Sequence, residues 1–161
     1  MGRVTWIVSA VLYLGVIVWG WLVLPADGVA AHMSLSGEVT RYGSRAEFVG
    51  TNLGLALLML GITPALSSAA TRGDASMLNM PNKDYWLQPE RREATLSLVR
   101  TQLWYFLAAT NLLIAVMMAD IVAISMLGRD VVGPWMLALY LVGTIIWTVW
   151  FTRRFRRPED A

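Results

Sequence analysis

The stretch Leu103–Leu127, LWYFLAATNLLIAVMMADIVAISML, carries a single charged residue, Asp120, and decides the fold. A helix that crosses a hydrocarbon core of about 30 Å needs about 20 mostly apolar residues, and this stretch supplies them. Three further stretches share this character, so spans are predicted near residues 5–24, 48–66, 101–127 and 132–151. A soluble domain of 161 residues would not carry four such stretches. The sequence therefore predicts an all-α polytopic membrane protein with four transmembrane helices.

The composition favours one membrane domain over residues 1–161. Hydrophobic residues make up 57% of the chain and charged residues 15%, with a mean hydropathy of +0.54. The four spans leave an outer loop at 25–47 and a second connecting segment at 67–100. The first span is longer and richer in tryptophan than the core of a signal peptide, so we expect it to be retained. Because the chain has no cysteine, disulfides, thiolate metal sites and cysteine nucleophiles are excluded.

The basic residues predict the orientation. With a cytoplasmic N-terminus, three of them lie outside: Arg41, Arg45 and Arg129. The other ten of the 13 lie inside: Arg3, Arg72, Lys83, Arg91, Arg92, Arg100, Arg153, Arg154, Arg156 and Arg157. Cytoplasmic loops carry the excess of Lys and Arg. Both termini are therefore predicted to be cytoplasmic.

Proline and glycine mark the predicted helix ends. The first helix should end at Leu24-Pro25, and Pro64 should kink or terminate the second. Pro89 suits a first helical position, so one helix should begin there and run through the third span to Leu127, over about 58 Å. The link around Gly128 is so short that the last two spans must be antiparallel neighbours.

Asp120 is the one ionisable residue deep inside a predicted span. A carboxylate at that depth costs a few kcal/mol unless it is neutral, paired or in contact with water. Two interpretations stay open. Asp120 forms a proton or cation site, or it makes a structural hydrogen bond to another helix, with Asn52 at similar depth as the candidate. Asn111 lies on the opposite helix face, which weakens the case for a polar transport path along this helix.

The single histidine, His32, lies in the outer loop, where it could sense pH or bind a metal. One histidine among scattered acids lacks a metal-binding spacing, so we predict no metal site and favour a histidine that hydrogen-bonds the loop backbone. No phosphate-binding glycine loop, nucleophile elbow or paired catalytic carboxylate occurs. We therefore expect no enzyme activity and no cofactor. The C-terminal arginines should hold the helix end against anionic lipid rather than bind nucleic acid.

Two blocks of residues resemble a known family. The outer block has Leu24-Pro25, His32, Gly37 and Tyr42-Gly43-Ser44-Arg45. The second block has Pro81, Asn82, Lys83, Asp84, Tyr85, Trp86 and Leu87, followed by Pro89, Glu90, Arg91 and Arg92. Together they resemble a bacterial membrane-domain family of unknown function that also forms the N-terminal part of the SdpI immunity and signalling proteins. The resemblance implies a multi-pass protein of the bacterial cytoplasmic membrane, with functional residues in both blocks.

Three functional expectations stay open, and the resemblance supports the first of them. The first is a toxin-immunity or signalling module that binds a peptide or protein partner through Pro25, His32, Gly37, Tyr42 and Arg45. In it, the cytoplasmic block 82–92 anchors or relays the event through the third helix. The second is a transporter or channel subunit that uses Asp120 and Asn52 and is completed by homo-oligomerisation. The third is an assembly factor for a membrane complex. We also predict that the outer loop folds over the bundle and brings His32 toward Asp120.

Overall fold

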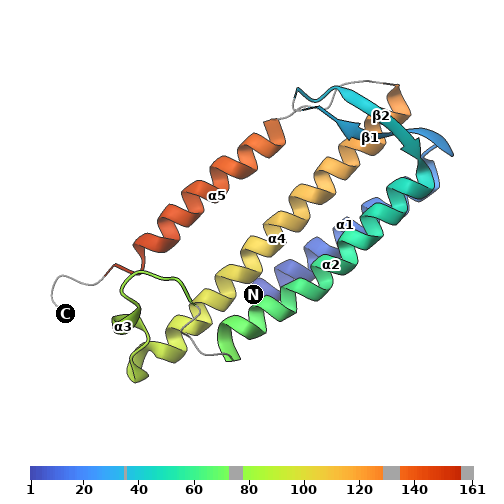
Figure 1. Cartoon of the computed structure of the whole chain (residues 1–161). Helices are drawn as coiled ribbons and strands as arrows, with labels where there is room; N and C mark the ends of the chain where they lie inside the picture. The colour runs from blue at the N-terminus through green and yellow to red at the C-terminus, as the bar shows by residue number, and fades with distance from the viewer. Residues whose placement is uncertain (35, 73–77, 129–134, 157–161) are drawn as a thin grey trace.

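The computed structural model of the chain describes residues 1–34, 36–72, 78–128 and 135–156. Its elements, in order, are α1 (Gly2–Val23), β1 (Asp27–Met33), β2 (Val39–Ser44), α2 (Arg45–Arg72), α3 (Lys83–Trp86), α4 (Pro89–Leu127) and α5 (Trp135–Arg153) (Figure 1). The predicted link through Arg129 and Asp130, and Arg157 of the C-terminal arginine cluster, lie outside the described residues.

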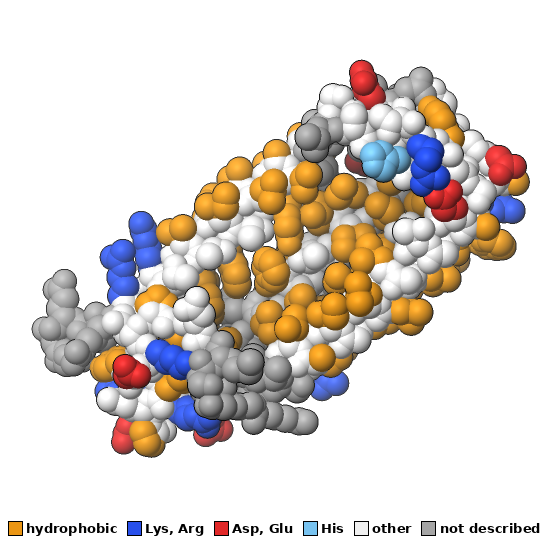
Figure 2. Space-filling view, viewed as in Figure 1, with side chains coloured by type: hydrophobic (Ala, Val, Ile, Leu, Met, Phe, Trp, Pro, Cys, Tyr) orange, Lys and Arg blue, Asp and Glu red, His pale blue; other side chains and the backbone are white. Residues whose placement is uncertain are grey.

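Three of the described helices are long and apolar enough to cross a membrane. They are Gly2–Val23, Arg45–Ser67 within α2, and Pro89–Leu127, with mean hydropathies of 2.1, 1.6 and 2.1. The space-filling view agrees, because hydrophobic side chains cover the middle of the visible face while charged ones gather at its two ends (Figure 2). The described apolar part of α5 is shorter, Leu137–Arg153. The chain is therefore a mostly helical, multi-pass membrane protein.

Helices α1, α2 and α4 form the core of the bundle. Tyr13 and Ile17 of α1 pack with Ala56 of α2 and Ala115 of α4 in one buried cluster. Near the start of α1, Trp6 packs edge-on against Trp104 of α4, with ring centroids 5.2 Å apart. Among the helices of the described part, α5 packs against α4 alone. It lies on the side of α4 away from α1 (Figure 1).

The prediction for α4 is confirmed at both ends. The helix spans Pro89–Leu127, 39 residues, with proline in its first turn. Gly128 ends it in the left-handed conformation, with φ of 61°, and donates its N–H to the carbonyl of Ile124. Glycine tolerates that backbone angle at no steric cost, which explains the stop.

The predicted end of α1 is also confirmed, because Leu24 caps a helix that ends at Val23. Termination of α2 at Pro64 is wrong, since α2 begins at Arg45 and continues through Pro64 to Arg72. Proline removes one backbone donor, and transmembrane helices tolerate that loss.

The all-α prediction is wrong at the outer loop. Asp27–Met33 and Val39–Ser44 form an antiparallel hairpin of β1 and β2, paired from Asp27 with Ser44 to Met33 with Val39. The turn includes Gly37 with φ of 90°, a conformation that favours glycine. Three register irregularities interrupt the pairing. The burial pattern of β1 therefore does not alternate, and the usual period of two that marks a strand is missing.

Candidate functional site

The hairpin lies over one end of the helix bundle, so the predicted folding of the outer loop onto the bundle is confirmed. Val29 and Ala30 of β1 are buried against Phe48 of α2 and against Ile121 and Val122 of α4. The backbone N–H of Ala30 donates to the hydroxyl of Ser125 at 3.1 Å. The hairpin is therefore attached to α4 by apolar packing and by one hydrogen bond.

A cavity of about 160 Å³ lies beneath the hairpin, between β1, α2 and α4. Its apolar lining consists of Val29, Ala30, Ala31, Phe48, Leu55, Met118 and Ile121. Its polar lining consists of Ser44, Glu47, Thr51 and Asn52, all on β2 or α2. Mostly apolar concavities with a few polar groups are the usual form of a binding site. This cavity is the candidate functional site.

An ion pair and a helix cap hold the polar side of the cavity. Arg41 donates through Nη2 to Glu47 Oε1 at 2.6 Å and through Nη1 to Oε2 at 3.2 Å. These hydrogen bonds raise the pKa of the Arg41 guanidinium above its usual value. Ser44 precedes α2 and accepts the N–H of Glu47 at 3.1 Å, as an N-cap does. The strand β2 is thereby joined to the first turn of α2.

Arg45, predicted as a ligand-binding residue, is engaged by α1. Its Nη1 donates to the carbonyls of Trp21 at 3.3 Å and Leu24 at 3.2 Å, and its guanidinium lies 4.8 Å from the centre of the Trp21 ring. A cation at a helix C-terminus stabilises the unpaired carbonyls there. The structure therefore gives Arg45 a role in closing the end of α1.

The other predicted outer residues are separate from the cavity lining. Pro25, Tyr42 and His32 are exposed, and Gly37 forms the turn. The ring Nδ1 of His32 lies 2.8 Å from the hydroxyl of Thr40, which donates to the carbonyl of His32 at 3.2 Å. The histidine is visible on the surface of the hairpin (Figure 2).

Asn52, predicted as an intramembrane polar site, bonds to α1. Its Oδ1 accepts the Tyr13 hydroxyl at 2.8 Å, and its Nδ2 donates to the carbonyl of Phe48 at 2.8 Å. Within the described part of the chain, no hydrogen bond joins Asn52 to Asp120. Asp120 is partly buried on α4. The amide of Asn52 is therefore used in holding α2 to α1.

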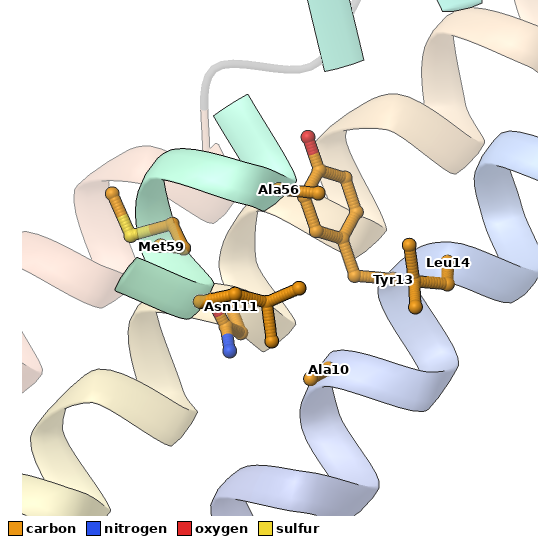
Figure 3. A pocket seen from close by; sticks show the side chains of 7 residues that line it. Ala10, Tyr13, Leu14, Ala56, Met59 and Asn111 are labelled. Atoms are coloured by element: carbon orange, nitrogen blue, oxygen red, sulfur yellow. The ribbon is translucent and has the colours of Figure 1, made fainter. Parts of the chain in front are cut away.

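A second polar pair joins α1 to α4 deeper in the bundle. Asn111 Nδ2 donates to the hydroxyl of Ser9 at 3.3 Å, and Ser9 donates to the carbonyl of Trp6 at 2.7 Å. A small pocket lies beside this pair, where Tyr13 and Asn111 approach α2 next to Ala56 and Met59 (Figure 3). Its volume of about 10 Å³ admits at most about one water molecule. This pocket therefore belongs to the packing of the bundle.

The predicted cytoplasmic block gathers around the segment that follows α5. Asn82 Nδ2 and Trp86 Nε1 both donate to the carbonyl of Phe155, at 2.8 and 2.9 Å. The rings of Trp86 and Phe155 meet edge-on at 5.7 Å, and the guanidinium of Arg91 lies 4.2 Å from the centre of the Tyr85 ring. We call Asn82, Trp86 and Phe155 the clasp. Of the remaining predicted residues, Lys83 begins α3, Pro89 begins α4, and Pro81, Glu90 and Arg92 are exposed.

Sequence reasoning missed three of these features. The Tyr13 and Ser9 partners carry no sequence signal, because a single polar residue in an apolar helix does not identify its neighbour. The sequence Ser44-Arg-Ala-Glu47 was a readable signal, since serine followed three residues later by glutamate marks a helix start. Within the described residues, no group of three acidic or histidine side chains could hold a metal ion.

Comparisons with protein-family models, with characterised proteins and with solved structures give no match for this chain.

Proposed function

We propose that this protein is a membrane-embedded binding module whose ligand, the apolar part of a membrane-active peptide or partner protein, enters the cavity beneath the hairpin. The observation that carries the proposal is the cavity itself, with apolar walls from three elements and a polar rim at Glu47 and Thr51. An apolar ligand gains from leaving water, and the rim offers hydrogen bonds that fix its orientation.

The topology that we propose has four spans and both termini in the cytoplasm of a bacterium. α5 supports a fourth span because its apolar side chains, including Leu139 and Ile146, are 63 and 64% exposed. Such exposure is unfavourable in water and ordinary in lipid. The placement of the basic residues supports the orientation, because the two arginines at the hairpin end are both engaged within the protein. Arg41 is paired with Glu47, and Arg45 is bound to α1.

Within this proposal, the protein serves in immunity or signalling in the manner of the SdpI-type family, and it is not an enzyme. The hairpin supports a role on the outer face, and the clasp supports a role for the cytoplasmic block. α4 connects the hairpin and the clasp region as one continuous helix. Its residue Ile121 packs under the hairpin, and its residue Arg91 lies beside Tyr85. Ligand contact would be made through the cavity and not through Arg45.

Filling the cavity tests the proposal. Thr51→Trp and Leu55→Trp place an indole in the cavity, and Leu57→Trp, at a position of the same helix that is 68% exposed, is the matched control. Sensitive bacteria that produce each variant at equal membrane levels are challenged with secreted membrane-active peptides. We expect survival with the wild-type protein and with Leu57→Trp, and loss of survival with the two cavity variants. Equal survival with all variants would exclude the cavity as the binding site.

The cysteine-free chain also allows a test of topology. Ser36→Cys in the hairpin turn should react with an impermeant maleimide added outside intact cells. Asn79→Cys and Thr152→Cys should react only after the membrane is opened. Labelling of Thr152→Cys from outside would place the end of α5 on the other face and remove the fourth span.

A transporter or channel subunit is the alternative, and the position of Asp120 favours it. Asp120 follows Gln102 by 18 residues, about five helical turns, so the two lie in line along α4. Gln102 accepts the indole N–H of Trp147 at 3.1 Å, so this line faces α5. Ion flux in proteoliposomes that Asp120→Asn abolishes would support this alternative, and unchanged flux would count against it.

A further inference from the structure

The start of α1 shows where the edge of the apolar core lies along α4. A Cβ added to Gly2 would lie 3.0 Å from both the carbonyl oxygen of Thr101 and the Cβ of Trp104, so α1 begins beside Thr101. α1 has 22 residues and is about 33 Å long, close to the thickness of a hydrocarbon core. The part of α4 before Thr101 therefore extends past the apolar core, into the layer of lipid headgroups and beyond.

A second and larger cavity lies along that part of α4. Its volume is about 430 Å³, and its described lining consists of Pro89, Arg92, Glu93, Leu96, Ser97 and Arg100. Arg92 and Arg100 are eight residues apart, which is about 12 Å along the helix and about 80° around it, so both lie on one side of α4. The Ser97 hydroxyl lies between them in the sequence, and Leu96 is buried, with 8% exposure.

The two arginines have unused hydrogen-bonding capacity. Within the described part of the chain, neither guanidinium makes a hydrogen bond or an ion pair, although Arg41, Arg45 and Arg91 all have partners. Two positive charges against the one negative charge of Glu93 leave a net charge of +1 in the cavity lining. That charge complements one monoanionic group.

We propose that this cavity binds the phosphodiester headgroup of a membrane phospholipid. Guanidinium groups bind phosphate oxygens in pairs of parallel hydrogen bonds, and Ser97 adds a further donor. Glu93 accepts a hydrogen bond from the hydroxyl or ammonium of the headgroup. Arg100 directly precedes Thr101, so one end of the cavity adjoins the apolar core, and this favours a lipid over a soluble phosphate because the acyl chains then continue along the apolar surface of α4.

Native mass spectrometry of the full chain in neutral detergent tests the proposal. The probes are phosphatidylglycerol, phosphatidylethanolamine and diacylglycerol, of which the last lacks phosphate. We expect the two phospholipids to bind and diacylglycerol not to bind. Binding of all three with equal affinity would overturn the proposal, because recognition would then depend on the acyl chains.

Matched charge variants locate the site. Arg92→Gln with Arg100→Gln should weaken phospholipid binding about tenfold, which corresponds to about 1.4 kcal/mol. Arg3→Gln with Arg156→Gln removes the same charge elsewhere and should change affinity less than about twofold. Equal losses in both pairs would show general attraction to basic residues and overturn the proposal. Circular dichroism of each variant checks that it keeps its helices.

Competition separates the two sources of phosphate. Glycerol phosphate at millimolar concentration should leave the bound phospholipid in place, because it lacks the acyl chains. Displacement of the lipid at that concentration would assign the cavity to a soluble phosphate compound and overturn the assignment to lipid. The result is independent of the peptide-binding cavity beneath the hairpin.

Discussion

The indole N–H of Trp86 donates to the backbone carbonyl of Phe155 at 2.9 Å, across 69 residues of sequence. Asn82 donates to the same oxygen at 2.8 Å, so one carbonyl accepts two side-chain bonds. Phe155 is 3% exposed, and its ring also packs edge-on against Phe151 at 5.0 Å. These contacts join the segment before α4 to the segment after α5.

Trp86→Phe should loosen the end of α5. The ring is kept and the hydrogen bond is lost, at a cost of about 0.5–1.5 kcal/mol, and Trp86→Ala should cost more because the aromatic contacts go too. Disulfide cross-linking of Lys83→Cys with Arg156→Cys, the positions next to the bonded residues Asn82 and Phe155, would measure the loss of proximity. Trp150→Phe, on the exposed side of α5, is the control and should cross-link like the parent. Unchanged cross-linking in Trp86→Ala would contradict the role of the clasp.

Tyr13→Phe should destabilise the contact between α1 and α2. The change leaves the buried Oδ1 of Asn52 without the hydroxyl that it accepts at 2.8 Å, and hydrogen bonds between membrane helices contribute about 0.6 kcal/mol on average. Unfolding in mixed micelles with increasing dodecyl sulfate measures the change. A double-mutant cycle with Asn52→Leu isolates the pair, and a coupling of zero would show that the bond contributes nothing.

Gly20→Ala should destabilise the bundle and Gly15→Ala should not, although both glycines lie on α1. A Cβ at position 20 would lie 2.6 Å from Phe48 Cε1, whereas a Cβ at position 15 meets no atom within 4 Å. Overpacking costs about 1–3 kcal/mol, while alanine in an open helical position stabilises by about 0.5–1 kcal/mol. The same micelle titration compares the two variants. Equal stabilities would mean that α1 and α2 do not pack as closely as described.

Arg45→Gln should lower the stability of the protein more than Arg41→Gln. Arg45 serves two carbonyls at the end of α1, at a cost of about 1 kcal/mol on removal, while Arg41 forms an exposed ion pair. If Arg45 were instead a ligand-binding residue, its substitution would reduce peptide binding and leave unfolding unchanged. Both quantities are measured on the same purified variants.

The sequence predicted the helices better than it predicted their contacts. The start of α4 was readable because Pro89 suits a first turn, and its end because apolar residues stop at Leu127 before a glycine. The start of α2 was placed late, at Phe48, because the charged residues Arg45 and Glu47 concealed three helical residues. Recognising Ser44 as the N-cap, with Glu47 three residues later, would have placed the start of α2 correctly.

The sites were less predictable for a physical reason. The sequence did not predict the hairpin, because its register irregularities remove the alternation of buried and exposed residues. Trp86 and Asn82 were predicted as members of one block, but their partner is a backbone carbonyl, which every residue possesses. The cavity beneath the hairpin depends on three elements meeting, and no one segment carries that information.

Past Pro89, α4 contains neither glycine nor proline. Sharp kinks in helices arise at such residues, so α4 has no built-in place to bend. A helix of this kind is stiff, so a force applied at one end tilts, rotates or translates the whole helix. We therefore expect a ligand that moves the hairpin against Ser125 to displace the opposite end of α4 as well. Two glycines introduced near Ala109 would create a hinge, and the two halves of α4 would then move separately.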